Sequence, residues 1–189
     1  MCAATALMMA ASIASACSSS SSSITVPANR DTRPTVDASG VRPDGFDTVE
    51  YQVRRADGSV CRLCLYLART TAQQERGLMH VTDLAGRDGM AFPFDPPAAQ
   101  RLWMQDTVIP LTALWFDADG RFIQRDDMDP CPRGASNCPT YGPDATSALV
   151  IEFPVGRVDE LRLGAGSRLV QVWAAGPDSS GPRTCPLGS

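Results

Sequence analysis

Two Asp-Gly pairs, at residues 57–58 and 119–120, each separate two runs that are rich in Val, Tyr, Leu and Phe. The surrounding segments are DTVEYQVRRADGSVCRLCLYLA and TALWFDADGRFIQRD. Asp-Gly between two such runs indicates a β-hairpin, because both residues tolerate the backbone angles that a tight turn between strands requires. Two hairpin signals in a short chain predict that antiparallel strands form most of the fold.

The rest of the pattern predicts further short strands and little helix. Strands bounded by Gly or Pro are expected in DGMAFPFDPP, RLWMQD, SALVIEF and RLVQVW. One short helix should begin near Thr70 or Thr71 and end near Gly77, and GRVDELRLGAG should add a helical turn or two. We therefore expect a mainly β fold, either a β-sandwich or a small barrel, with one or two short helices.

The N-terminal stretch differs in composition from the rest of the chain. Residues 1–17 carry no charge and are rich in Ala, which is typical of an export signal. They end in ASAC, which is similar to the cleavage motif of bacterial lipoproteins, so we expect Cys17 to carry lipid. A plain signal peptide cleaved near Ala16 is the alternative. Lipid on Cys17 would hold the protein on a membrane essentially permanently.

The remaining composition predicts the organisation of the exported chain. Residues 18–45 are Ser-rich and then Pro-containing, with no apolar periodicity, and should form a disordered tether. Residues 46–175 should form a single globular domain, since 189 residues are few for two domains, and 176–189 a tail. The expected location is the extracytoplasmic face of the bacterial cell membrane, or outside the cell if Cys17 is unmodified.

The charged residues argue against nucleic-acid binding. The 17 basic residues are all arginines, 21 residues are acidic, and the net charge is -4. A surface that binds nucleic acid normally needs a clustered excess of basic residues. We expect no nucleic-acid partner. The expected partners are the membrane, through the lipid anchor at Cys17, and an unknown small ligand or envelope protein bound by a monomer.

Five of the seven cysteines lie beyond the signal, where an exported protein favours disulfides over metal ligands. Cys131 and Cys138 bound the short loop CPRGASNC and are predicted to form a disulfide. Cys185 could then pair with Cys61 or Cys64, which leaves one thiol free. A zinc site is disfavoured because the spacing within the two cysteine pairs differs. We expect no metal and no cofactor.

Several segments, read together and in order, resemble the domain-of-unknown-function 192 family (DUF192). They are ERGLM, DGMAFPF, RLWMQDTVIPLTALWFDADGRF, YGP, ALVIEFPVGRV and GAGSRL, over roughly residues 62–170. The resemblance implies a compact, mainly β domain without an established biochemical activity. Members often follow an export or lipoprotein signal, and this chain looks like an exported, actinobacterial-type member with a lipoprotein-like signal.

The chain departs from the family pattern in two places. Thr112 stands where an aspartate usually follows Pro-Leu, which removes a carboxylate that an acid-base mechanism could have used. His80 and Val81 stand where an aromatic residue and an arginine are common. His80, the only histidine, is therefore a local feature of this chain, and we expect it to be incidental to function.

Five residues are candidates for binding a ligand: Arg76, Trp103, Met104, Asp117 and Glu152. Arg76, at the end of the expected helix, could hold a carboxylate or phosphate through two hydrogen bonds. Its alternative role is a salt bridge to Glu152 or Asp117. Strand side chains alternate between faces, so one of Trp103 and Met104 should face the core and the other the opposite side.

We expect no catalytic residue, and a non-catalytic envelope protein that binds a ligand or partner. One alternative is an envelope hydrolase that uses Asp117 and Glu152 as paired carboxylates. The other is copper(I) handling through methionine thioethers, although methionine is more often core filler. The methionines concerned are Met79, Met90, Met104 and Met128. Convergence of the carboxylates at a cleft would favour the first alternative, and clustering of the methionines near the surface the second.

Overall fold

The computed structural model describes residues 40–131, 133–135 and 137–172. The strands are β1 (Asp47–Arg54), β2 (Val60–Leu67), β3 (Gly89–Ala98), β4 (Leu102–Trp103), β5 (Leu111–Phe116), β6 (Phe122–Met128), β7 (Thr140–Tyr141), β8 (Ser147–Pro154) and β9 (Arg168–Val172). The helices are α1 (Thr71–Arg76) and α2 (Arg157–Glu160). The expected mainly β fold with one or two short helices is confirmed.

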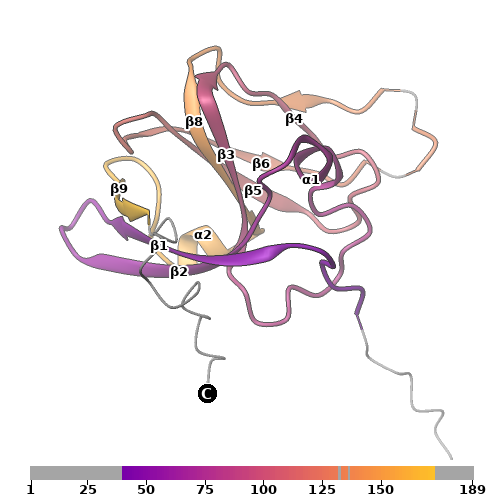
Figure 1. The fold of residues 1–189 in the computed structure, drawn as a ribbon, viewed down its shortest axis with the longest axis horizontal. Coiled ribbons are helices and arrows are strands. Elements are labelled where there is room, and N and C mark those ends of the chain that lie inside the picture. Colours follow the sequence, from indigo (N-terminus) through magenta and orange to yellow (C-terminus); the bar gives the residue numbers. More distant parts are fainter. Residues whose placement is uncertain (1–39, 132, 136, 173–189) are drawn as a thin grey trace, which may run out of the picture. The chain divides into compact units, whose positions relative to one another are not determined.

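Seven strands form one sheet in the order β6-β5-β8-β3-β2-β1-β9, and β4 pairs with β7. Only the β2–β3 pairing within the seven-stranded sheet is parallel. The two end strands approach each other where an isolated bridge joins Arg121 to Arg168. There the Leu169 amide also donates to the Gly120 carbonyl at 2.8 Å. The sheet is therefore a nearly closed barrel (Figure 1), which selects the barrel from the two expected architectures.

An aspartate side chain holds the turn of each predicted hairpin. Asp57 Oδ1 accepts hydrogen bonds from the backbone N–H and the hydroxyl of Ser59, at 2.9 and 2.6 Å. Asp117 Oδ1 accepts from the backbone N–H groups of Asp119 and Arg121, at 2.9 and 2.8 Å. These turns join β1 to β2 and β5 to β6, and both hairpins are confirmed.

The core consists of two clusters on opposite faces of the sheet. β5 is buried at every position, so its alternating side chains supply both clusters. Leu114 and Phe116 pack in one cluster with residues of β1, β2 and β8. Trp115 lies in the other, with Leu78 after α1 and Met104 after β4. A continuous apolar run in β5 is thus explained by burial on both faces.

Helix α1 begins and ends close to where its sequence predicts. Thr70 is the N-cap, and its side chain and that of Gln73 each accept from the other's backbone N–H in a capping box. Gly77, with φ of 45°, ends the helix. Leu78 then turns into the core at 2% exposure. The helix therefore leaves Arg76, its last residue, at the surface beside this turn.

Residues 40–45 are bound to the domain. The Val41 carbonyl accepts from the Asp83 amide at 3.1 Å, and Arg42 forms a salt bridge with Asp83 at 2.7 Å. Most of the tether expected at 18–45 lies outside the described residues. So do the signal, Cys17 and the C-terminal tail. Residues 40–45, the described part of the expected tether, thus run along the domain surface.

Cys131 and Cys138 form the predicted disulfide. Cys64 is also disulfide-bonded, and Cys61 is buried and free. Cys185, the expected partner of one of these two residues, lies outside the described residues. Disulfides are typical of oxidising compartments, so this chemistry suggests an extracytoplasmic environment. Within the described part of the chain, no helix has the length and apolarity to span a membrane.

Candidate functional site

Glu152 is a buried carboxyl group in the middle of β8. It lies between Met90 of β3 and Ala113 of β5 in the sheet register and is only 5% exposed. No side chain or backbone group among the described residues forms an ion pair or hydrogen bond with its carboxyl group. Burial raises the pKa of Glu152 to about 8. The carboxyl group is therefore mostly protonated and neutral at pH 7.

A narrow cavity connects Glu152 to the surface. It is bounded by the end of α1, the turn at Gly77, β4 and β8, and both Arg76 and Trp103 line it together with Glu152. Its volume is about 30 Å³. A single water needs about 10 to 15 Å³ on this measure, so the cavity has room for one small functional group but not for a whole cofactor.

Arg76 is exposed at the rim of this cavity. Its guanidinium carbon lies 4.4 Å from the centre of the Phe46 ring, and its Nη2 donates a hydrogen bond to the Asp44 carbonyl. It forms no ion pair with Glu152 or Asp117 in the described part of the chain, unlike the alternative role considered for it. A guanidinium has five N–H donors, so donors remain for a ligand.

Trp103 and Met104 face opposite ways, as strand alternation predicts. Trp103, in β4, is 53% exposed and lines the cavity. Met104 is fully buried and packs in the core. The structure thus brings three of the five candidates, Arg76, Trp103 and Glu152, to one cavity and places Met104 beneath it.

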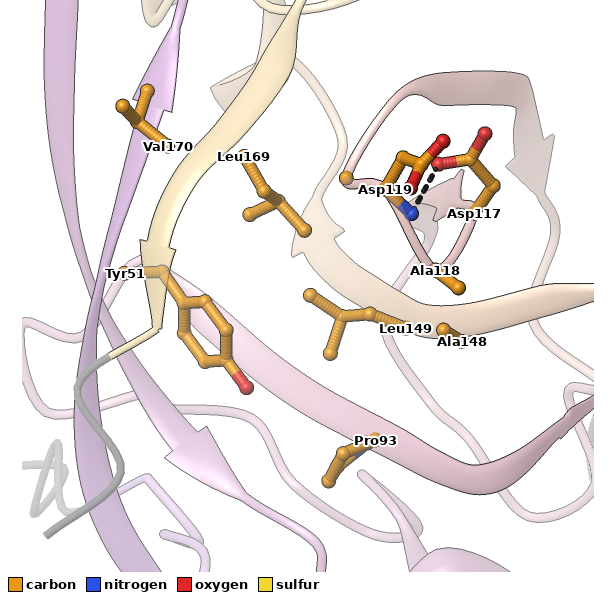
Figure 2. A pocket seen from close by; sticks show the side chains of 10 residues that line it. Tyr51, Pro93, Asp117, Ala118, Asp119, Ala148, Leu149, Leu169 and Val170 are labelled. Carbon is orange, nitrogen blue, oxygen red and sulfur yellow. Dashed lines mark hydrogen bonds between the residues drawn. The ribbon is translucent and has the colours of Figure 1, made fainter. Parts of the chain in front are cut away.

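Asp117 lies at a different place, in the turn after β5. It lines a second cavity, with Tyr51 and Leu169 on other strands (Figure 2). One oxygen of its carboxylate is already bound within the turn. Asp117 and Glu152 therefore do not line a common cleft, and the geometry does not favour a hydrolase that uses them as a pair.

The methionines do not cluster at the surface. Met90, Met104 and Met128 are each at most 1% exposed and belong to one core cluster. This arrangement suits core packing and does not favour copper(I) handling. Among the described residues, no group of three or more His, Cys, Asp or Glu side chains is placed to hold a metal ion.

Sequence reasoning missed three polar residues that line the Glu152 cavity: Gln74, Glu75 and Thr107. Gln74 Nε2 donates to the carbonyls of Pro93 and Ala68, at 2.8 and 3.3 Å, and so fastens α1 to β3. Thr107, which follows β4, is 5% exposed at the cavity. In the sequence, Gln74 resembles any polar residue on an exposed helix, so nothing marked it as a site residue. Thr107 stands in an apolar stretch, and this position could have indicated that it is buried.

The fold and the cavity define a class: a small barrel-like β domain with a buried carboxyl group that lines a surface cavity. The chain belongs to the DUF192 family of uncharacterized proteins, whose family model matches residues 52–171. The family membership inferred from the sequence motifs is thereby confirmed. A search of the curated proteins gives no match.

Two solved structures are similar to this chain. A candidate transcription regulator from Sinorhizobium meliloti 1021 is 26% identical, with a TM-score of 0.58, over 67% of this chain and 95% of the other. A protein of unknown function from Novosphingobium aromaticivorans DSM 12444 is 27% identical, with a TM-score of 0.56, over 70% of this chain and 93% of the other. Each match spans about two thirds of this chain and nearly all of the other chain.

Proposed function

We propose that the cavity beside Glu152 binds the carboxylate of a small ligand, and that the protein is a non-catalytic binding protein of the cell envelope. The observation that carries this proposal is the buried Glu152 carboxyl group, which lines a surface cavity and has no partner among the residues that the structure describes. Because its pKa is about 8, the group is neutral at pH 7 and can donate a hydrogen bond. An ionised carboxyl group there would repel an anion.

Two of the rim residues complement a carboxylate, whereas the exposed Glu75 adds a negative charge to the same cavity lining. Arg76 supplies a positive charge and a planar pair of N–H donors, which suit the two oxygens of a carboxylate. The exposed ring of Trp103 offers apolar surface to the part of the ligand outside the cavity. The small volume admits a planar carboxylate more readily than a tetrahedral phosphate. Together these features favour a small organic acid as the ligand.

Benzoate should bind to this cavity, and Arg76→Gln should weaken the binding about tenfold or more, because a charge-assisted hydrogen bond contributes about 1.5 to 3 kcal/mol. The measurement is a titration followed by the fluorescence of Trp103, which a bound ring would change. Trp103→Phe identifies the part of the signal that comes from this residue. Inorganic phosphate, titrated in the same way, tests whether the cavity distinguishes carboxylate from phosphate.

A matched control for the loss of one arginine is Arg62→Gln in β2. The Arg62 side chain is 70% exposed and reaches only Glu50, at 3.6 Å. This variant should bind benzoate like the original protein. Equal affinities in the Arg76 and Arg62 variants, or no binding of benzoate at millimolar concentrations, would contradict the proposed function.

Attachment to the membrane is the second part of the proposal. It is supported by the lipoprotein-like sequence that ends at Cys17 and by the disulfide between Cys131 and Cys138. In a bacterial host, Cys17→Ala should move the protein from the membrane fraction to the soluble fraction, because the acyl chains provide the anchor. Mass spectrometry of the mature N-terminal peptide checks the modification. An unmodified Cys17 in the membrane-bound protein would rule out the lipid anchor.

Transcription regulation, the role in the name of the S. meliloti structure, is not part of our proposal. The net charge of -4 opposes the electrostatic attraction that dominates binding to phosphates. The small ligand would be bound by a monomer, since the cavity lies within one domain. Analytical ultracentrifugation with and without benzoate tests this expectation, and a dimer that forms only with benzoate would oppose it.

A further inference from the structure

A second cavity lies at the seam where β9 approaches the β5–β6 turn, and Glu152 does not line it. Its volume is about 280 Å³, and residues of β1, β3, β8, β9 and the β5–β6 turn line it (Figure 2). A Cβ atom on Gly120 would come within 2.8 Å of the Leu169 carbonyl oxygen, and Gly120 has a φ of +76°. Only glycine lets the turn approach β9 this closely. The edge of the cavity is therefore defined by tight backbone packing.

One polar side chain in this cavity has no partner within the described part of the chain. Tyr51, in β1, is 2% exposed, and its hydroxyl points toward the space between Leu149 and Pro93 (Figure 2). No hydrogen bond reaches this hydroxyl from the described residues. Burial raises the pKa of Tyr51 to about 12, so the hydroxyl stays protonated. Buried tyrosine hydroxyls usually have a partner, which makes this donor available to a molecule in the cavity.

The walls and the rim restrict what the cavity can hold. Pro93, Leu149 and Leu169 present apolar surface, which would strip water from a charged group without replacing it. At the rim the two carboxylates of Asp117 and Asp119 share one guanidinium, that of Arg121, so the excess of negative charge disfavours an anion. An apolar cavity of about 150 Å³ can hold benzene, so this one has room for a single substituted ring. These limits select a neutral and mainly apolar molecule.

We infer that the seam cavity binds a small, uncharged, mainly apolar molecule with one hydrogen-bond acceptor, which the Tyr51 hydroxyl recognises. The inference goes beyond the proposed function, because none of the residues involved lines the cavity beside Glu152. Either site can therefore exist without the other. The hydroxyl would orient the acceptor end of the molecule inward, and the apolar walls would enclose its ring.

Acetophenone and ethylbenzene test this inference as a matched pair. They have nearly the same shape, but only acetophenone carries a carbonyl acceptor. The protein is the exported full chain with Cys17→Ala, which avoids detergent, and binding is followed by NMR shifts of the Gly120 and Leu169 amides. We expect acetophenone to bind about 3- to 10-fold more tightly than ethylbenzene, as one net hydrogen bond predicts. Both sets of shifts should map to the seam.

Two variants and a control distinguish recognition of the carbonyl acceptor from simple filling of the cavity. Tyr51→Phe keeps the ring and removes the hydroxyl, so the affinity ratio of the two probes should fall to about one. Ala148→Trp, which narrows the cavity, should abolish both, whereas Val60→Trp at an exposed position of β2 should change neither. The inference is overturned if neither probe binds, if the shifts map elsewhere, or if Tyr51→Phe leaves the ratio unchanged.

Discussion

Replacing Trp115 with alanine should lower the free energy of unfolding by about 3 to 5 kcal/mol, the range typical of large aromatic residues lost from a core. Trp115 is fully buried on β5, a strand that is buried at every position. A Cβ atom on Gly142 would lie 3.2 Å from its ring, so backbone also packs tightly around it. The surrounding structure can relax only partly, which leaves a void. Urea denaturation measures the loss.

Trp103→Ala is the matched control for Trp115→Ala, because the same side chain is removed from a position that is 53% exposed. Its effect on the free energy of unfolding should be about 1 kcal/mol or less, as for most surface substitutions. Similar losses of unfolding free energy in both variants would mean that Trp115 is not packed in the core as described. A loss below about 1 kcal/mol for Trp115→Ala would lead to the same conclusion.

Glu152→Gln should stabilise the protein by a few kcal/mol at pH 8 and have little effect near pH 4, because only an ionised Glu152 is costly to bury. Burial raises the pKa of Glu152 from 4.5 to about 8 in the folded state. Between these values the folded protein binds more protons at this site than the unfolded chain. Stability contributed by the protonated group is therefore fully present below pH 4.5 and falls as the pH rises to about 8.

The test compares urea denaturation of the original protein and of Glu152→Gln at several pH values. The difference between their free energies of unfolding should grow with pH by up to about 1.4 kcal/mol per unit. Glu75→Gln, at an exposed position of α1, serves as the control and should follow the original protein. A difference that stays constant with pH would show that Glu152 is not protonated in the folded state.

The same titration bears on the proposed ligand. Above pH 8 the ionised Glu152 would repel a carboxylate, so benzoate binding should weaken as the pH rises through this value. Glutamine at position 152 keeps an N–H donor and cannot ionise, so binding to that variant should lose this pH dependence. The pH dependence of stability and the pH dependence of benzoate binding would then both report the protonation of Glu152.

Local features of the fold could be predicted from the sequence because their causes are local. Asp-Gly pairs set the two hairpins, and Thr70 with Gly77 bounds α1 through capping and a positive φ. Alternation correctly separated Trp103 from Met104. Each of these depends on residues a few positions apart.

The composition of the site could not be predicted in the same way. Whether Glu152 or Asp117 lies near Arg76 depends on which strands are neighbours, and the order β5-β8-β3 is set by packing of the whole sheet. The seam cavity depends on how closely the β5–β6 turn approaches β9. The alternating pattern of β1 indicates that Tyr51 is buried, but it cannot indicate that no described residue forms a hydrogen bond with its hydroxyl.

The pairing of β1 with β9 has a consequence for how the chain reaches its folded state. The first strand of the domain gains its second neighbour only after residues up to Val172 have been synthesised. Until then the β1–β2 hairpin has an unpaired edge, which is a site for association with other chains. Contacts between such distant segments also slow folding. This topology should therefore make the nascent chain dependent on protection by a chaperone, whatever the folded domain binds.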